Sequence, residues 1–581
     1  MQTKTILLPV LALSAITAWE GAAQARGGAK RAARAQSQTQ AQPAEETAPQ
    51  AAPTQPQRRV VPTTTAAELY NVVFIISDQM SARALSIYGN DNISTPNIER
   101  LAREGVQFMN SVCVVPTSSP ARGSLLTGLY PMAHGVLNNV SSGVAPVDNN
   151  LPSPEKILFA DGYATRWFGK WHLGEIADYP CYHSSTDIRA DSRGRYAEIR
   201  RRNHPQAATP PKGYVLAEAN ADQGYGFYQT EYLYNLTKRL AEDQSNRHIV
   251  KDIGSIGRYG VPADLFDWTQ AVDEGLDFIR ANKDRPFMAT ISVSPPHPAF
   301  AICEPYYSMV DPARIKLSPS FGEKSKIYAN DSQYIMGQYL GEQGIREKMR
   351  CYYAQCLFVD DMIGRILATL DKLDLTRKTI VVFTADHGDP LSSHGGLYGK
   401  SIDGLVEELV CTPALITLPG VIPAGKKVVA HFHSADFAPT LLDYLGQSIP
   451  SSMQGRSFRP IIEGKEKDVV GFGYTMRPAG ARNIRGEIDG RMYSYSKVFV
   501  LGDNGSKTRE ELYDLTADPC QMKNVIDDKK FAPIKARMIA QYDAFNKRVG
   551  DQMIENLPQK GLLNYGNLKK NKQGEYIGSD D

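Results

Sequence analysis

Residues 71–79 read Asn-Val-Val-Phe-Ile-Ile-Ser-Asp-Gln, an unbroken apolar and β-branched run that ends in polar residues. Such a run is typical of a parallel strand covered on both faces, because a doubly covered strand shows no alternation of apolar and polar residues. Thr379–Thr384 and Phe287–Val293 repeat the pattern. Amphipathic helical patterns lie between the strands, at Ala271–Asn282 and Met349–Leu373. The alternation predicts an α/β fold with a large, mostly parallel central sheet flanked by helices.

Two of the predicted strands run directly into pairs of polar side chains. Asp78 and Gln79 follow the first strand, and Asp386 and His387 follow the strand at 379–384. Ligands gather beyond the carboxyl ends of parallel strands, so these four side chains are expected to meet there. A single Asp at a strand end is more often a helix N-cap. Two such pairs instead favour a site for one hard divalent cation.

Residues 118–128 read Ser-Ser-Pro-Ala-Arg-Gly-Ser-Leu-Leu-Thr-Gly and predict the start of a helix. Ser is a favoured N-cap and proline is tolerated in the first turn, so we expect Ser118 to be the cap and Gly128 to close the helix. The unpaired N–H groups of a helix N-terminus favour a bound oxyanion, and Arg122 adds a planar cation one turn further on. The alternative interpretation is an ordinary capped helix.

Three further segments carry groups suited to anion binding or proton transfer. In a Gly-Lys-Trp-His-Leu-Gly stretch, Lys170 and His172 stand two residues apart, which places both on one face of an extended segment. His297 lies between prolines that stiffen the backbone aiming it. Lys400 lies in a Gly-rich loop that also contains His394. Taken singly, these residues would be surface charges or hydrogen-bonded core imidazoles.

The composition excludes some partners and predicts an exported protein. Across 581 residues, 65 Lys and Arg face 63 acidic residues, so no basic field points to nucleic acid. Residues 1–25 combine Lys4 with an apolar run and a small-residue ending, which predicts a signal peptide cleaved near Ala25. Residues 26–66, rich in Ala, Gln and Pro, predict a disordered linker. No later stretch is apolar over ~20 residues, so we expect no stable membrane anchor and a periplasmic or secreted protein.

The remaining chain is expected to hold two folded domains. The catalytic domain is predicted over 67–446, with a closing helix at Asp436–Gly446. Shorter strands and turns over 447–550 predict a smaller C-terminal α+β domain with an antiparallel sheet, followed by a tail at 551–581. Seven scattered cysteines give no disulfide framework and leave at least one unpaired, and we expect Cys113 to pack in the core.

The 118–128 stretch resembles the signature of the type I sulfatases: Cys or Ser, any residue, Pro, any residue, Arg, three residues, then Leu-Thr-Gly. The Lys170 segment and Glu511–Pro519 match further motifs of that family, so the resemblance covers roughly 71–525. It implies an alkaline-phosphatase-like fold and a sulfuric ester hydrolase in which Ser118 is oxidised to formylglycine. One hydroxyl of the formylglycine hydrate attacks sulfur and the other later expels sulfate. The serine form of the signature implies a bacterial protein and a radical S-adenosylmethionine maturating enzyme as partner.

The resemblance also implies a metal site. It assigns Ca²⁺ to Asp78, Gln79, Asp386 and His387, with the formylglycine at Ser118 as a further ligand. Family members usually carry Asp where Gln79 stands here. The lower charge and the nitrogen ligand keep Mg²⁺ and Mn²⁺ open as alternatives.

The family mechanism assigns a role to each remaining group. Lys170, Lys400 and Arg122 are implied to neutralise the sulfate oxygens. His297, with Lys400, is implied to protonate the departing alcohol. His172 is implied to remove a proton from the remaining hydroxyl, so that sulfate leaves.

The expected substrate is a sulfated carbohydrate of the mucin O-glycan or glycosaminoglycan type. The insertion at 178–260 is rich in Arg, Tyr and His, and we expect His394 and Arg485, or Arg482, to contact substrate. The insertion could equally be a solvated surface excursion. Two alternative functions stay open: a phosphate or phosphonate ester hydrolase on the same scaffold, and a glycan-binding pseudoenzyme in which Ser118 is unmodified.

Overall fold

The structure is a computed structural model. It describes residues 69–140, 146–174, 210, 212–217, 226–324, 327–329, 331–400, 404–477, 480–502, 505–551, 569–570 and 576–577. The chain divides into two units, Met1–Ala67 and Glu68–Asp581. The first unit, with the predicted signal peptide and linker, lies outside the described residues. None of the helices described has the length and apolar character needed to cross a bilayer.

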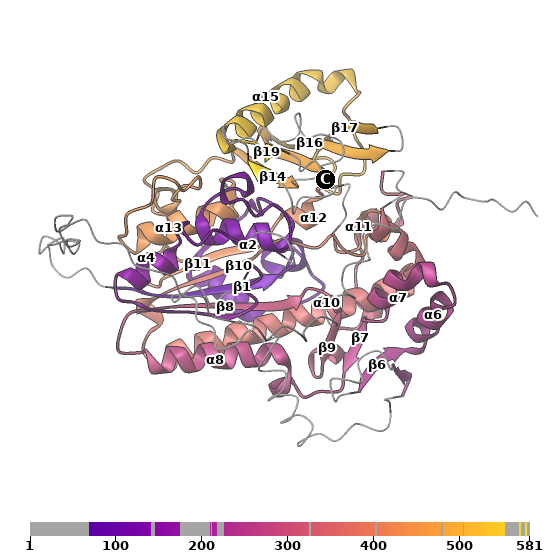
Figure 1. Cartoon of the computed structure of the whole chain (residues 1–581), viewed down its shortest axis with the longest axis horizontal. Coiled ribbons are helices and arrows are strands. Elements are labelled where there is room, and N and C mark those ends of the chain that lie inside the picture. Colours follow the sequence, from indigo (N-terminus) through magenta and orange to yellow (C-terminus); the bar gives the residue numbers. More distant parts are fainter. Residues whose placement is uncertain are drawn as a thin grey trace, which may run out of the picture. The chain divides into compact units, whose positions relative to one another are not determined.

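A seven-stranded sheet forms the centre of the second unit, in the order β12-β2-β11-β10-β1-β8-β4. Figure 1 labels its middle strands β11, β10, β1 and β8. Its strands are β12 Lys426–Val428, β2 Val106–Phe108, β11 Ala414–Thr417, β10 Thr379–Ala385, β1 Asn71–Asp78, β8 Phe287–Pro296 and β4 Ala164–Gly169. β1 runs parallel to β10 and β8, and β4 runs parallel to β8. β11 is antiparallel to both of its neighbours. The predicted mostly parallel sheet is confirmed, and the first predicted strand lies between the other two.

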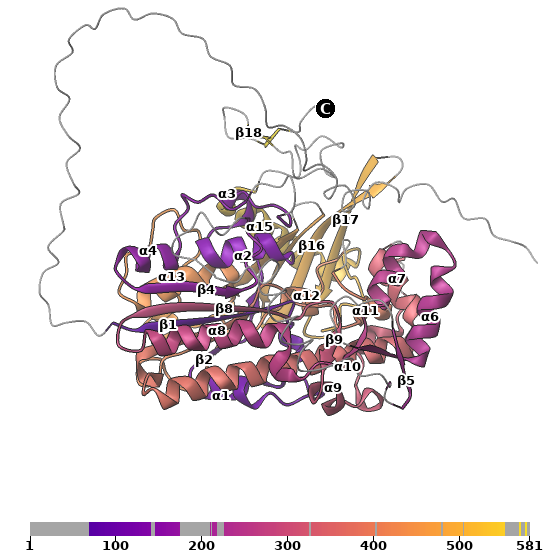
Figure 2. The same cartoon turned by 60° about the horizontal axis from the view of Figure 1, so that its bottom comes forward.

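Helices cover both faces of this sheet. The main ones are α1 Pro96–Glu104, α2 Ser118–Thr127, α4 Pro154–Ala160, α8 Asp267–Ala281, α10 Ser332–Lys372 and α13 Phe437–Tyr444. Figure 2 shows α8 and α10 along one face and α2, α4 and α13 along the other. β1 is buried along its whole length: Val73 and Ile75 join the core beneath α8 and α10, whereas Phe74 packs against Phe437 of α13. The unbroken apolar run of β1 is therefore explained by its two covered faces.

Shorter elements complete the layer around the sheet. The short helices are α3 Pro131–His134, α9 Tyr306–Met309, α11 Ser393–Gly396, α12 Glu407–Val410 and α14 Arg459–Ile462. β3 Ser111–Val112 pairs with β13 Phe432–His433. The predicted closing helix at 436–446 is confirmed by α13.

The described part of the 178–260 insertion is folded and not only a surface excursion. It supplies three strands of a four-stranded sheet, ordered β5-β6-β7-β9, and two helices. The five elements of the insertion are β5 Tyr214–Leu216, β6 Phe227–Thr230, α6 Glu231–Ala241, α7 Arg247–Ile253 and β7 Gly257–Tyr259. The fourth strand of the sheet, β9 Ala301–Cys303, comes later in the chain. Residues 178–209, 211 and 218–225 lie outside the described residues.

The C-terminal part holds an antiparallel sheet, as predicted, and one long helix packs on it. The elements are β14 Phe472–Arg477, β15 Ala481–Ile488, β16 Arg491–Gly502, β17 Gly505–Asp514 and α15 Ala532–Val549. Met538 and Phe545 of α15 belong to the core that Tyr474 and Leu512 of the sheet also build. β14 also bonds to the main body, because the amide of Met476 donates to the carbonyl of Val114 at 2.8 Å. The predicted boundary between residues 446 and 447 stays a prediction.

The long helix α10 differs from its predicted extent. α10 begins at Ser332, well before the predicted start at residue 349, and non-helical backbone at Gly341 kinks it. The first part of α10 is polar and rich in glycine, so it shows no apolar periodicity that would predict a helix.

The cysteines in the described residues are all free, and Cys113 is buried as expected. Cys181 lies outside the described residues.

Candidate active site

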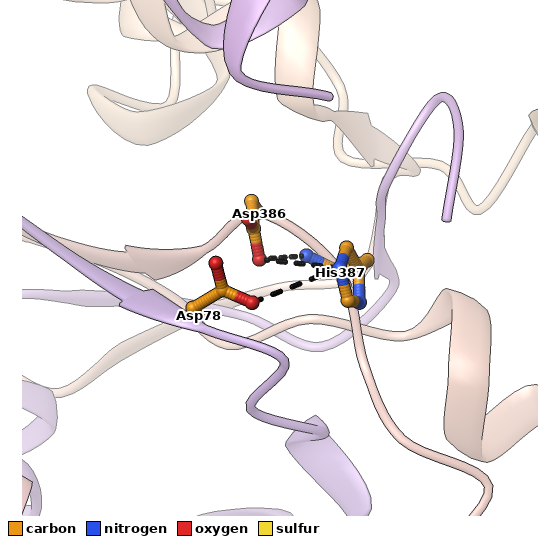
Figure 3. A group of neighbouring side chains, drawn as sticks. All are labelled: Asp78, Asp386 and His387. Carbon is orange, nitrogen blue, oxygen red and sulfur yellow. Dashed lines mark hydrogen bonds and ion pairs between the residues drawn. The ribbon is translucent and has the colours of Figure 1, made fainter. Parts of the chain in front are cut away.

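Asp78, Asp386 and His387 meet at the carboxyl end of the central sheet (Figure 3). Asp78 ends β1 and Asp386 follows β10, and the parallel register of these strands brings the two residues level. His387 Nε2 lies 3.9 Å from Asp78 Oδ1 and 3.7 Å from Asp386 Oδ1. All three side chains are fully buried. The predicted meeting of the two strand ends is thus found in the structure.

The donor atoms of this cluster suit a divalent cation. His387 Nδ1 lies 2.9 Å from the carbonyl oxygen of Gly388, which can only accept, so Nδ1 carries the hydrogen and Nε2 keeps its lone pair. Asp78 Oδ1 and Gln79 Oε1 are buried and have no hydrogen-bond partner in the described part of the chain. Buried oxygens without partners are costly unless they bind an ion or water. These residues therefore fit a hard divalent metal ion with mixed oxygen and nitrogen ligands.

Gln79 adopts an unusual backbone conformation, with φ of 64°. Its amide N–H donates to Asp386 Oδ1 at 3.0 Å, and its carbonyl accepts from the Tyr352 hydroxyl at 2.8 Å. Its side-chain nitrogen donates to Asp389 Oδ2 at 2.7 Å. Gln79 is therefore fixed at three points beside the carboxylates.

The start of α2 differs from the prediction by one residue. Thr117, with φ −144° and ψ 131°, is the N-cap, and Ser118 is the first helical residue. The prediction that Ser118 caps the helix is wrong, because its hydroxyl turns to the acidic cluster instead and lies 3.1 Å from His387 Nε2. Gly128, with φ 66°, closes the helix as predicted.

Arg122 bridges the two aspartates. Its Nε donates to Asp386 Oδ2 at 3.0 Å and its Nη2 to Asp78 Oδ2 at 3.2 Å, while Nη1 donates to the carbonyl of Lys170 and to Ser292 Oγ. Four of its five N–H groups are thus engaged within the protein. The guanidinium is fully buried. Arg122 mainly holds two like charges together, and one N–H remains for any sulfate oxygen.

The predicted ammonium groups also reach the cluster. Lys170 Nζ pairs with Asp78 Oδ2, and Lys400 Nζ lies 3.1 Å from His387 Nε2. His172, in contrast, does not lie on an extended segment, because its φ is 61°. The prediction of an extended Lys170–His172 segment is therefore wrong. Gly169, directly before Lys170, also has a positive φ of 81°, and a Cβ there would lie 2.0 Å from the Ser292 carbonyl oxygen.

Burial and neighbouring charges move the carboxylate and imidazole pKa values apart. Burial alone would raise the pKa of Asp78, but Lys170 and the other cations around it hold that pKa well below its usual value. Burial, and then the charge of Asp78, raise the pKa of Asp386. Burial, and then Lys400, lower the pKa of His387 well below its usual value, so its imidazole is neutral. A neutral imidazole is the form that binds metal ions.

His297 and Lys400, the groups predicted to protonate the departing alcohol, are also perturbed by burial. Burial lowers the pKa of His297 to about 3, against the attraction of Asp78. Nδ1 of His297 lies 2.6 Å from the Pro298 carbonyl oxygen, so Nε2 is the nitrogen without a hydrogen. Burial lowers the pKa of Lys400 to about 8. Pairs of groups with separated pKa values near a buried cation site are typical of catalytic centres.

The residues expected to contact substrate lie in other interactions. His394 Nδ1 lies 3.0 Å from Glu323 Oε2. Arg485 Nη2 pairs with Glu407 at 2.8 Å and is buried, and Arg482 pairs with Asp551. Within the described residues, these ion pairs lie apart from the cluster of Asp78, Asp386 and His387. Their role in substrate binding stays a prediction.

Sequence reasoning missed three residues at the site. Ser292 of β8 accepts from Arg122 at 2.8 Å. Asp389 and Lys348 form a buried pair at 3.0 Å behind Gln79. Asp389 follows Asp386 by three residues and could have been found from that spacing, and a Lys amid the buried face of a long helix was a second signal.

The chain matches the sulfatase family model over residues 70–447, and it belongs to the sulfatase family. The model for the C-terminal part of N-sulphoglucosamine sulphohydrolase matches residues 395–548. The fold, the sulfatase resemblance and the class of enzyme are thereby confirmed: the chain is a sulfuric ester hydrolase.

Curated relatives are similar over most of the chain. An ulvan-active sulfatase of Formosa agariphila is 26% identical over 83% of this chain and 82% of its own length. An N-acetylglucosamine-6-O-sulfatase of Bacteroides thetaiotaomicron is 24% identical over 83% of this chain and 87% of its own length.

Solved structures share the fold. A protein in complex with its substrate D-glucosamine-2-N,6-O-disulfate has a TM-score of 0.61 and 20% identity over 84% of this chain and 99% of that one. The phosphonate monoester hydrolase of Agrobacterium radiobacter has a TM-score of 0.62 and 21% identity over 88% of this chain and 100% of that one.

Proposed function

We propose that this chain hydrolyses a sulfate ester of a sulfated carbohydrate, with residue 118 as formylglycine beside a bound divalent cation. The observation that carries the proposal is the approach of Ser118 Oγ to His387 Nε2, at 3.1 Å, inside the cluster with Asp78 and Asp386. Ca²⁺ is the proposed ion, with Mg²⁺ and Mn²⁺ as alternatives. When present, these groups would supply a hydrate oxygen as nucleophile and polarise it.

The chain's own residues prepare the site for an anionic ester. Arg122 holds the two aspartates at fixed positions before any ligand arrives. Lys170 contacts Asp78 and Lys400 contacts His387. Both ammonium groups supply positive charge that stabilises sulfate oxygens.

Proton transfer is proposed for the two histidines predicted to perform it. His297 keeps its Nδ1 hydrogen on the Pro298 carbonyl, so Nε2 is the atom that takes up a proton and returns it to the departing alcohol. An anionic ester near His297 would raise its pKa from about 3 and so favour the protonated form. His172 is proposed to take the proton from residue 118 that allows sulfate to leave.

A sulfated glycan is the proposed substrate class. The support is that two similar curated proteins are named for carbohydrate substrates, the ulvan-active sulfatase and the N-acetylglucosamine-6-O-sulfatase. Export to the periplasm or the medium, maturation by a radical S-adenosylmethionine enzyme and a two-domain division at residues 446/447 belong to the same proposal.

The proposal is tested on protein co-produced with such a maturating enzyme. Mass spectrometry of the tryptic peptide containing residue 118 should show the loss of two hydrogens. The modified protein should then release sulfate from one or more sulfated sugars in a panel that also contains a phosphonate monoester. Ser118→Ala should abolish turnover. Ser119→Ala, which removes the adjacent buried hydroxyl that accepts from the Val140 amide at 2.9 Å, is the matched control and should keep turnover.

Two other outcomes of this experiment would support the alternative functions. Unmodified serine together with phosphonate hydrolysis would assign the alternative ester hydrolase. Unmodified serine with glycan binding and no turnover would assign the pseudoenzyme. Either result would overturn the proposed sulfatase mechanism.

A further inference from the structure

Within the described part of the chain, the side-chain oxygen of Gln79 has no partner, whereas its side-chain nitrogen and both of its backbone polar groups form hydrogen bonds. Its amide N–H, its carbonyl and its side-chain nitrogen bond to Asp386, Tyr352 and Asp389, respectively. Oε1 is buried and has no hydrogen-bond partner among the described residues. Tyr352 further anchors this turn, because its hydroxyl accepts from the Ser81 amide at 3.0 Å. The side chain is thus held in place, and its oxygen is an acceptor that a ligand can use.

The orientation of the Gln79 amide depends on Asp389. Asp389 Oδ2 is a carboxylate oxygen and can only accept, so it requires the nitrogen end of the amide to face it. The other oxygen, Oδ1, accepts from Lys348 Nζ at 3.0 Å and from the Leu391 amide at 2.8 Å. Three donors therefore converge on one fully buried carboxylate.

Lys348 keeps Asp389 in this state. Both side chains have no exposed surface, and they form an ion pair away from water. The ammonium group also lies over the rings of Phe300, at 4.7 Å, and Tyr398, at 5.7 Å from the ring centroids. A buried charge surrounded by aromatic rings needs its partner, so the pair is a rigid support.

We infer that Asp389 and Lys348 are positioning residues that fix the Gln79 amide with its oxygen turned toward the proposed cation. The inference rests on the proposed cation site. A carboxylate offers a cation two equivalent oxygens, whereas the amide of Gln offers one oxygen and one nitrogen. A site with Gln therefore needs a neighbouring group that keeps the amide oxygen directed to the cation. Outer partners of this kind orient the ligands that touch a metal ion.

The inference predicts a specific failure and a specific rescue. In Asp389→Asn, Oδ1 can still accept from Lys348 and Leu391, so the Asn nitrogen faces Gln79 and forces its amide to turn round. In the double variant Gln79→Glu with Asp389→Asn, that nitrogen donates to one Glu oxygen and the other oxygen stays available to the cation. The formal charge of Gln79, Asp389 and Lys348 taken together is the same in the double variant as in the wild type.

Isothermal titration of purified, metal-free full-length protein with CaCl₂, and separately with MnCl₂, measures the effect without any substrate. Asp389→Asn should raise the cation Kd by roughly 10–100-fold, as outer-shell changes typically do. The double variant should recover most of the lost affinity, because one Glu oxygen is again available to the cation. Gln79→Leu, which leaves the Lys348–Asp389 pair intact, should weaken binding as Asp389→Asn does and stands in if that variant does not fold.

Glu407→Gln is the matched control. It breaks a comparably buried ion pair with Arg485, at 2.8 Å, so it should lower the Tm and leave the cation Kd unchanged. A folded Asp389→Asn with unchanged Kd, an equally weak double variant, or an unchanged Gln79→Leu overturns the inference while leaving the proposed function standing. Absence of cation binding by the wild type overturns both.

Discussion

Glu155 should make the stability of this protein depend on pH in a predictable direction. It lies in the first turn of α4, is only 4% exposed, and its Oε1 accepts from Thr290 Oγ1 of β8 at 3.1 Å. Burial raises its pKa from 4.5 to about 7. The folded protein therefore binds this proton more tightly than the unfolded chain does. The resulting stabilisation is fully present below pH 4.5 and is lost as the pH rises through about 7.

The magnitude follows from the shift in pKa. A rise of about 2.5 pKa units corresponds to about 3 kcal/mol between acidic pH and pH above 7, at about 1.36 kcal/mol per unit. Glu155→Gln keeps the shape and the acceptor for Thr290 but carries no charge, so it should escape this loss. Unfolding entropy for a unit of this size is about 1 kcal/mol per degree. The Tm of the variant relative to the wild type should therefore rise by about 3 °C between pH 4.5 and pH 8.

Calorimetry or circular dichroism across that pH range, at a fixed saturating cation concentration, provides the test. Glu487→Gln removes the same charge from an exposed position on β15 and should show no such trend relative to the wild type. A Tm difference between Glu155→Gln and the wild type that stays constant or falls with pH would refute the reasoning from burial.

Three further predictions concern the site and its support. Arg122→Met leaves the two buried aspartates without their shared partner and should cost about 3–5 kcal/mol of stability; calorimetry should show a smaller loss when Ca²⁺ is saturating, since the cation replaces the missing charge. Lys400→Met should lower kcat/KM for a sulfated sugar by about 10²–10³-fold, measured by sulfate release, if it stabilises transition-state charge. Gly337→Ala should destabilise by about 1–3 kcal/mol in thermal unfolding, because its Cβ would lie 1.7 Å from the Gly396 carbonyl oxygen, whereas Gly322→Ala, with nothing within 4 Å, should be tolerated.

The sheet could be predicted because its strands are apolar for a physical reason. β1, β8 and β10 are covered on both faces, and that environment forces the continuous apolar runs seen at 71–76, 287–293 and 379–384. The first part of α10 could not be found in the same way. Its polar residues and its kink at Gly341 break the 3.6-residue pattern, and contacts distant in sequence decide its conformation.

The site was predictable where it depends on strand ends and not where it depends on tertiary contacts. Asp78, Asp386 and His387 follow from adjacent parallel strands and were found from the sequence. The direction of the Ser118 hydroxyl could not be predicted from the sequence. Local capping preferences favour a bond within the helix, but the hydroxyl contacts the imidazole of His387, which is distant in sequence. The place of Lys348 among apolar residues of its helix indicates a buried charge, but its partner, Asp389, comes from a different part of the chain, and the sequence of the helix does not identify that partner.

Charge balance explains why the acidic cluster can fold before a cation binds. Asp78 and Asp386 would repel each other in a buried site of low dielectric. Arg122 bonds to both and Lys170 to one, so the four formal charges cancel. Lys400, beside His387, and the proposed divalent cation would add up to three positive charges, and one charge on an ester anion and one on the nucleophilic oxygen would balance two of them. The framework of two aspartates, Arg122 and Lys170 is thus neutral by itself, and the complete site favours an anionic ester, as electrostatic preorganisation requires.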